Sequence, residues 1–209
     1  MAKFYFPSFE DVDEDEAKTD QKYNTYGNTA IMTVGGKTVL FDCGASSNWT
    51  EINNYYKELR NKGVFETIDY IIISHYHYDH VGNFEKFIGK EEGYVNDDTI
   101  IYLPINPLDH TKYLESYGEK KEDKYTGSIV KYYNKVMNCL HNPKINRLYT
   151  VVRDVTEIEL VKGFCNIKLF NSSTEDYDHY KEEQATYNNY SLCALIKTGE
   201  LYSMFPGDI

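Results

Sequence analysis

Six consecutive residues near the middle of the chain carry side chains suited to binding metal ions. They read HYHYDH, residues 75–80, and contain three of the six histidines in the 209-residue sequence. In an extended segment His75 and His77 point in the same direction, so their imidazoles can converge on one cation. Asp79 and His80 follow where the chain begins to turn, which lets them face a second cation. Imidazole nitrogens and carboxylate oxygens without thiolate favour Zn²⁺, with Mn²⁺ or Fe as competitors.

The elements before this motif are those of a layered α/β domain. Residues 28–42 predict a β-hairpin, because two apolar runs flank the turn Gly35-Gly36. Residues 50–62 show helical spacing of their apolar side chains, and Gly63 follows as a stop signal. The continuous apolar run of residues 68–74 is typical of a strand buried on both faces, and it ends directly at the motif.

Beyond the motif the pattern is less regular. We expect a helix at residues 82–87, a strand at 99–103, and a surface insertion from about residue 105 to 147 that contains a helix over about 128–140. The last third predicts five strands, at residues 148–153, 157–161, 166–170, 192–197 and 201–205. Strands and helices in this order indicate a single α/β domain over residues 1–209.

Composition limits the possible partners and locations. With 22 basic and 33 acidic side chains the net charge is −11, which argues against a broad surface for duplex nucleic acid. Seven carboxylates between about residues 10 and 20 predict a solvated acidic loop. The sequence shows neither the apolar core of a signal peptide nor an apolar run long enough to span a membrane. Its four cysteines are far apart, without a CxxC pair, so we expect reduced thiols and a cytoplasmic location.

Three segments together resemble a known family. The pattern HxHxDH after a strand, followed by Gly82 and Asn83, is similar to the metal-binding signature of the metallo-β-lactamase fold superfamily. Residues 28–44, which end in FDCG, resemble the opening strands of that fold, and residues 188–209 resemble the paired strands that lead to its Gly-Asp. The resemblance covers most of the chain except about residues 105–147. It implies a four-layer αββα sandwich whose second half is incomplete here.

The resemblance also implies roles for individual residues. It implies His75 and His77 as ligands of a first Zn²⁺, Asp79 and His80 as ligands of a second, Asp208 as a carboxylate shared by both, and Asp42 as a carboxylate beneath the metals. The family normally adds a third histidine to the first metal, and this chain has Asn171 at that position. Of the other histidines, His110, His141 and His179, only His179 lies in the right stretch, so we expect it as the substitute ligand.

The resemblance implies a metal-dependent hydrolase that uses a metal-activated hydroxide, with Asp79 also orienting the water. The pattern Asn-x-x-Ser-Leu at residues 188–192 is most similar to the ComEC-type hydrolase branch, which favours a phosphodiester or nucleotide substrate over an ester, thioester, lactam or other small molecule. Tyr76 and Tyr78 either stack on an aromatic substrate group or pack the rim of the site.

The last family ligand is a histidine some tens of residues after the shared carboxylate, whereas this sequence ends at Ile209. We therefore expect the 209 residues to be a fragment or an incomplete gene product. The alternative is a degenerate, non-catalytic binding module of the same fold, because two expected histidine ligands have no counterpart. An oxidoreductase with di-iron and flavin is disfavoured, because the chain has no room for a flavin-binding domain.

Overall fold

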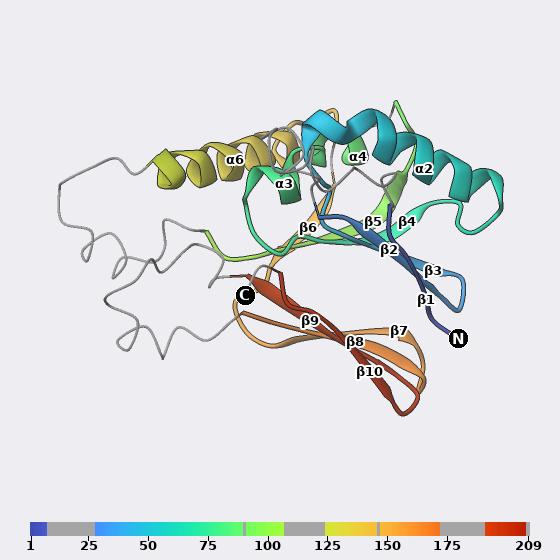
Figure 1. Ribbon diagram of the computed structural model, residues 1–209. Helices are drawn as coiled ribbons and strands as arrows, with labels where there is room; N and C mark the ends of the chain where they lie inside the picture. Colours follow the sequence, from blue (N-terminus) through green and yellow to red (C-terminus); the bar gives the residue numbers. More distant parts are fainter. Residues whose placement is uncertain (8–27, 90, 107–123, 146, 172–190, 208–209) are drawn as a thin grey trace, which may run out of the picture.

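The structure is a computed structural model that describes residues 1–7, 28–89, 91–106, 124–145, 147–171 and 191–207 (Figure 1). Its strands form two sheets. The six-stranded sheet contains, in spatial order, β1 (Lys3–Tyr5), β2 (Ala30–Val34), β3 (Lys37–Phe41), β4 (Ile68–Ile72), β5 (Val95–Leu103) and β6 (Leu148–Val151). The four-stranded sheet contains, in spatial order, β10 (Leu201–Phe205), β9 (Leu192–Thr198), β8 (Cys165–Asn171) and β7 (Thr156–Val161). Strands β1 to β3 and the whole four-stranded sheet are antiparallel, whereas β3 to β6 are parallel.

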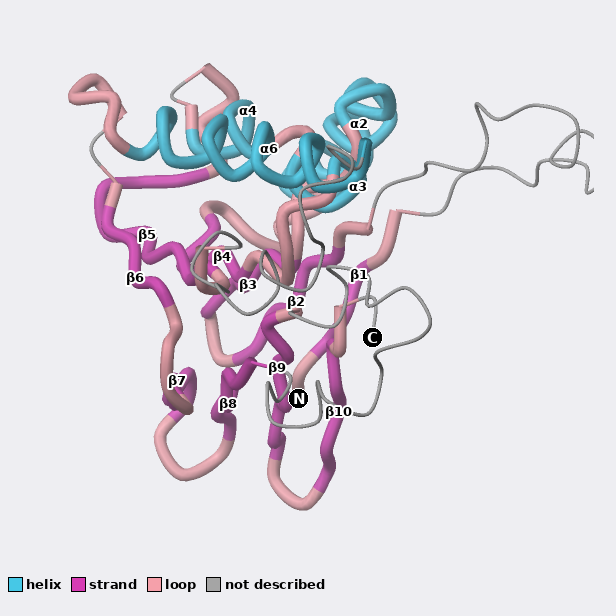
Figure 2. Tube along the Cα trace, turned by 90° about the vertical axis from the view of Figure 1, so that its left-hand side faces the viewer, coloured by secondary structure: helices cyan, strands magenta, loops and turns pink. Residues whose placement is uncertain are grey.

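The helices and the two sheets are stacked in layers. The described helices are the 3₁₀ turn η2 (Ser46–Asn48) and the α-helices α2 (Trp49–Asn61), α3 (Tyr78–Val81), α4 (Phe84–Ile88) and α6 (Lys124–Leu140). Figures 1 and 2 show the α-helices on one face of the six-stranded sheet and the four-stranded sheet on its other face. The two-sheet α/β architecture expected from the sequence is therefore confirmed. Within the described ranges no helix covers the outer face of the four-stranded sheet, so the layers are helix, sheet and sheet.

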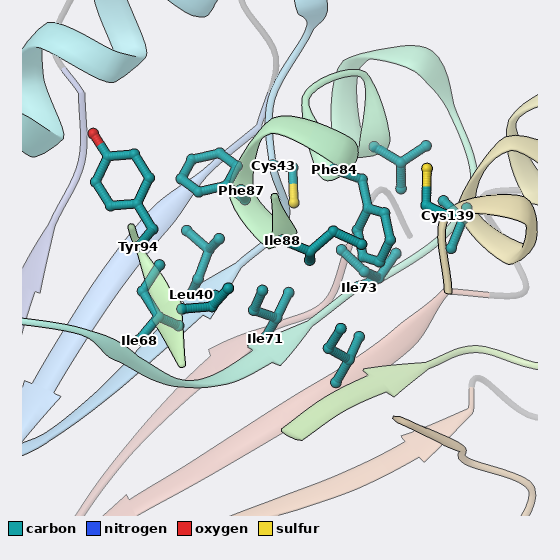
Figure 3. Packing of buried hydrophobic residues seen from close by; sticks show 14 of the residues in the cluster. Leu40, Cys43, Ile68, Ile71, Ile73, Phe84, Phe87, Ile88, Tyr94 and Cys139 are labelled. Atoms are coloured by element: carbon teal, nitrogen blue, oxygen red, sulfur yellow. The ribbon is translucent and has the colours of Figure 1, made fainter. Parts of the chain in front are cut away.

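Strand β4 is buried on both sides, and its side chains divide between two hydrophobic clusters. Ile71 and Ile73 belong to the cluster under the helices, where Figure 3 shows them with Phe84 and Ile88. Ile72 belongs to the cluster between the two sheets. This alternation follows from the two-residue period of a strand and explains why the run is apolar at every position. The strand is thus fixed on both faces where it delivers the chain to His75.

Most predicted elements are present, with shifted ends. The hairpin, the helix expected at residues 50–62, the strand of the apolar run and all five late strands are confirmed. The insertion helix is also confirmed and begins at Lys124, earlier than expected. The sequence pattern missed β1, which pairs with β2, and the four-residue helix α3 within the motif. The expected acidic loop lies outside the described residues. Among the helices of the described chain, none combines the length and apolar character that crossing a membrane requires.

Candidate metal centre

The candidate site lies where two neighbouring parallel strands end. Strand β3 continues into residues 42–45, here called the β3 loop, and β4 continues into residues 73–83, here called the motif loop. Because parallel strands end at the same edge of a sheet, the two loops meet there. Their backbones are joined directly, since the amide of Cys43 donates to the carbonyl of His80 at 2.6 Å. The side-chain amide of Asn83, which is buried, donates to the carbonyls of Cys43 at 3.1 Å and Ala45 at 2.7 Å.

Gly82 allows the closest approach of the two loops. Its backbone is helical, with φ −55°, so its role does not come from an unusual conformation. A Cβ atom at this position would lie 2.5 Å from the backbone nitrogen of Ser46 and 2.6 Å from the carbonyl oxygen of Tyr78. Both neighbours are backbone atoms, which cannot move aside as a flexible side chain can. The motif loop therefore packs against the segment after β3 only because residue 82 has no side chain.

Asp42 is the buried acceptor at the centre of the two loops. One carboxylate oxygen accepts the backbone N–H of Ser74 at 2.7 Å. The other accepts the Ser74 hydroxyl at 2.7 Å and lies 2.8 Å from Nδ1 of His80. Asp42 has φ +52°, a left-handed conformation that Asp tolerates better than most residues. The carboxylate thus orients the ring of His80, as a hydrogen-bonded carboxylate does for ligating histidines.

The contacts of His80 determine which ring nitrogen carries its lone pair. A carboxylate only accepts hydrogen bonds, so the Nδ1 atom that faces Asp42 carries the hydrogen. The Nε2 atom then has the lone pair, and it accepts from the side-chain amide of Asn28 at 2.8 Å. The carboxylate of Asp79 lies 3.6 Å from the same Nε2 atom, and its side chain is 35% exposed. His80 therefore presents a basic nitrogen toward Asp79.

His75 and His77 converge from the chain that follows β4. Nε2 of His75 lies 2.7 Å from Nδ1 of His77, and the two ring centroids are 4.6 Å apart. The ring of His80 is close as well, with its centroid 4.0 Å from that of His75. Burial lowers the pKa of His75 well below its ordinary value, and the neighbouring His80 and His77 lower it further. His75 is therefore neutral at physiological pH, which is the form of histidine that binds metals.

The arrangement of these rings fits a cation in donor type but is not an open cage. Two nitrogens bound to one tetrahedral Zn²⁺ at 2.0–2.1 Å lie about 3.3 Å apart. The facing nitrogens of His75 and His77 are 2.7 Å apart, so they must separate by roughly 0.6 Å to admit the ion. In the part of the chain that the structure describes, no three His, Cys, Asp or Glu side chains are already placed as a metal site. The chemistry of the donor set fits a metal, and a small side-chain rotation is required.

The four-stranded sheet closes the other side of the site. The backbone amide of Leu192 donates to the carbonyl of Ser74 at 2.7 Å, and the hydroxyl of Ser191 lies 3.4 Å from Nδ1 of His75. A Cβ atom on Gly207 would lie 2.5 Å from the Ser191 hydroxyl and 3.2 Å from Cβ of Ser74. A cavity of about 150 Å³ lies beside these residues and is lined by Asp42, Asn28 and His80 among others. The chain that precedes Asp208 is therefore in contact with the motif loop.

Other residues singled out in the sequence lie elsewhere. Asp208, His110 and His179 are outside the described residues. His141 is exposed and pairs with the hydroxyl of Tyr149 at 3.2 Å, away from the motif loop. Tyr76 is 3% exposed and donates to the carbonyl of Pro104 at 3.0 Å, so it is a packing residue and not a stacking platform.

Tyr78 packs at the rim of the site. Its hydroxyl accepts from the Ser46 hydroxyl at 3.0 Å and from the Ser47 backbone at 2.9 Å, and its ring tilts against that of Tyr132.

Sequence reasoning missed several residues that support the site: Asn28, Ser74, Ser191 and Gly207. Ser74 carried a local signal, because it is a polar residue directly after an apolar run. Ser191 stood within the Asn-x-x-Ser-Leu pattern, which indicated a family branch but no role for the hydroxyl. Asn28 and Gly207 carried no signal of their own, since each reaches the site only through strand pairing.

Comparison with known proteins agrees with this geometry. Residues 23–92 match the family model described as the metallo-beta-lactamase superfamily. This segment belongs to that superfamily. A protein from Arabidopsis thaliana named cleavage and polyadenylation specificity factor subunit 3-II is 37% identical over 60 residues, which cover 27% of this chain and 10% of that protein. The matched segment contains both the β3 loop and the motif loop, so the family assignment rests on the part of the chain that forms the candidate site.

Solved metallo-β-lactamases share the general arrangement at low identity. A motif mutant from Cronobacter sakazakii has 13% identity and a TM-score of 0.48, and covers 85% of this chain and 54% of its own. A subclass B3 metallo-beta-lactamase of Bradyrhizobium japonicum has 14% identity and a TM-score of 0.46, and covers 84% of this chain and 53% of its own. The chain thus spans about half the length of these structures. The described residues have the α/β metallo-β-lactamase-like fold with two sheets, and these matches do not distinguish the ComEC-type branch.

Proposed function

We propose that the protein is a metal-dependent hydrolase that acts on a phosphodiester. The observation that supports this most directly is the contact of three imidazoles at the end of β4, with the buried carboxylate of Asp42 hydrogen-bonded to one of them. Such a group of neutral nitrogens, held by an outer carboxylate, is suited to holding Zn²⁺ or a similar cation. When bound, two cations would supply an activated water nucleophile and polarise the scissile bond.

In this proposal the residues of the chain divide the work. His75 and His77 bind the first cation, Asp79 and His80 bind the second, and Asp208 binds both. Asp42 holds the Nδ1 proton of His80, which keeps the Nε2 lone pair available. Asp79 is the most exposed member of the group, so its carboxylate is placed to accept a hydrogen bond from the attacking water.

Two similarities favour a phosphodiester over an ester, thioester or lactam. Residues 188–192 resemble the ComEC-type pattern, and the Arabidopsis relative is named for cleavage and polyadenylation. That relative is similar only over 60 residues, so its name supports the reaction class and not a particular substrate. The net charge of −11 gives no help, since it repels polyanions at low salt.

The test compares substrates and metal content in the same samples. The protein is loaded with Zn²⁺ or Mn²⁺ and assayed with bis(p-nitrophenyl) phosphate, a p-nitrophenyl ester, a thioester and a chromogenic lactam. We expect two bound metal ions by native mass spectrometry and the highest activity on the phosphodiester. His75→Ala and Asp208→Ala should lose a metal ion and activity, whereas His141→Ala, on the surface, should keep both.

Two outcomes would overturn the proposal. Fewer than two tightly bound metal ions together with no hydrolysis would favour the degenerate binding module, an alternative that the direct contact of His75 and His77 keeps open. Wild-type metal stoichiometry in His75→Ala would refute the ligand assignment. Higher activity on the lactam or ester would keep the hydrolase and reject the phosphodiester.

A further inference from the structure

Asn171 reaches from one sheet to the other at the end of β8. The side chains of Cys165, Ile167 and Leu169 alternate on the buried face of this strand, and Asn171 continues the same two-residue period. Its side-chain amide donates to the carbonyl of Val152 at 2.9 Å, and Val152 directly follows β6 of the other sheet. The side chain is therefore held in one orientation between the sheets.

The amide oxygen of Asn171 is left without a partner. Among the described residues, Oδ1 of Asn171 is buried and accepts no hydrogen bond. A buried acceptor that gives up water without a replacement destabilises the folded protein. Leucine has a similar volume and would avoid this loss, so the oxygen indicates a need for an acceptor at this position.

Asn171 lies one strand away from the candidate metal centre. It pairs with Leu192 on β9, and the backbone amide of Leu192 donates to the carbonyl of Ser74 at 2.7 Å. Ser191, the residue before Leu192, places its hydroxyl 3.4 Å from Nδ1 of His75. The unpartnered oxygen is therefore at the same edge of the sheets as His75, on the side that faces the four-stranded sheet.

We propose that Oδ1 of Asn171 is an oxygen ligand for the cation held by His75 and His77, which shifts the preference of that position from Zn²⁺ toward Mn²⁺. This inference rests on the proposed function. An amide oxygen is a hard donor that suits Mn²⁺ and Mg²⁺, whereas imidazole nitrogen suits Zn²⁺. Replacing one nitrogen of the ligand set by an oxygen therefore weakens Zn²⁺ binding more than Mn²⁺ binding.

The test measures metal affinity directly and does not depend on turnover. Competitive titrations with Mn²⁺ and Zn²⁺ are carried out on the wild type, Asn171→Leu, Asn171→His and the control Asn166→Leu. Asn166 is on the same strand, five residues earlier and therefore on the opposite face. Loss of a supporting group around a metal lowers affinity about 10- to 100-fold, and loss of a ligand should be at least as large.

We expect Asn171→Leu to lose the first metal ion or to bind it at least tenfold more weakly, and Asn166→Leu to match the wild type. Asn171→His should raise the affinity for Zn²⁺ relative to Mn²⁺. Its Co²⁺ derivative should also show a changed visible spectrum, because the number of nitrogen ligands increases. The spectrum remains informative if the leucine variant fails to fold.

The outcomes separate this inference from the proposed function. If the wild type binds no cation, both fail. If the wild type binds two ions, and Asn171→Leu binds both with unchanged affinity, only the role of Asn171 is refuted. An Asn171→His variant with an unchanged Zn²⁺ to Mn²⁺ ratio and an unchanged Co²⁺ spectrum refutes it as well.

Discussion

The two sides of the candidate metal centre are held in different ways. On the motif side, short hydrogen bonds of 2.6–2.8 Å join the β3 loop and the motif loop, and Asp42 is bonded to both Ser74 and His80. On the side of the four-stranded sheet, the hydroxyl of Ser191 approaches His75 at 3.4 Å. A hydrogen bond of that length contributes less than one at 2.7 Å.

This difference separates formation of the site from its adjustment. The motif loop is fixed by groups within about 40 residues of sequence, so it holds its histidines together wherever the first sheet forms. The four-stranded sheet adds Ser191, Gly207 and Asn171 from far along the chain. Disrupting the motif side should therefore change both stability and metal binding, whereas changes on the other side should mainly change metal affinity.

The largest expected effect is that of Gly82→Ala. The added methyl group would meet two backbone atoms at 2.5 and 2.6 Å, so the motif loop must move away from the segment after β3. We expect a loss of about 3 kcal/mol in the free energy of unfolding, together with loss of metal binding. Chemical denaturation and native mass spectrometry measure the two effects.

Gly163→Ala is the control for that substitution. Gly163 has φ +67° and open space around it, so alanine there should cost only the conformational strain, roughly 1 kcal/mol, without changing metal content. If Gly82→Ala were as stable as Gly163→Ala and bound metal normally, the close contact between the two loops would not matter.

The second effect is that of Asp42→Asn, which keeps the size of the side chain and its tolerance for φ +52° but removes the charge. The bond to His80 is weakened, so we expect a loss of about 2 kcal/mol in the free energy of unfolding and a 10- to 100-fold loss of metal affinity. Asp69→Asn is the matched control, because Asp69 also accepts from a backbone amide, that of Thr38, and from Lys37. That variant should be less stable with unchanged metal affinity, and equal metal affinities in both variants would contradict the role of Asp42.

The third effect is a pH dependence in the metal-free protein. The pKa of His75 is lowered in the folded state, so below about pH 6.5 the unfolded chain binds a proton that the folded protein does not. The free energy of unfolding therefore falls as the pH falls through this range, by at most about 1.4 kcal/mol per pH unit. Denaturation of chelator-treated protein at pH 7.5, 6.5 and 5.5 measures the slope. His75→Gln should reduce the slope and His141→Gln should not, so identical slopes in all three proteins would rule out His75 as the source.

The sequence alone was sufficient for the motif side. The apolar run before His75 predicted a strand buried on both faces, and the spacing of His75 and His77 predicted that their rings converge. Both expectations agree with the structure, because strand alternation and local spacing decide them. Helix α3 was missed because four residues are too few to show a helical period.

The other side could not be predicted because its contacts join distant parts of the chain. Ser191 is 116 residues from His75 in sequence, and Gly207 reaches Ser74 only because β9 and β10 pair and stack beneath the first sheet. Composition and spacing carry no information on such a meeting. The shared ligand role of Asp208 and the substitute role of His179 stay predictions, because both lie outside the described residues.

The smallest effect is that of Ser191→Ala, which tests the weaker side of the site. The hydroxyl is 3.4 Å from Nδ1 of His75, and Ser74 offers the same nitrogen a closer oxygen at 3.0 Å. We therefore expect the free energy of unfolding to change by less than about 1 kcal/mol and metal affinity to fall only a few-fold. Ser74→Ala, which removes the closer oxygen and the bond to Asp42, should lower affinity more. Isothermal titration with Zn²⁺ on both variants ranks them, and a larger loss for Ser191→Ala would show that the four-stranded sheet, and not the motif loop, orients His75.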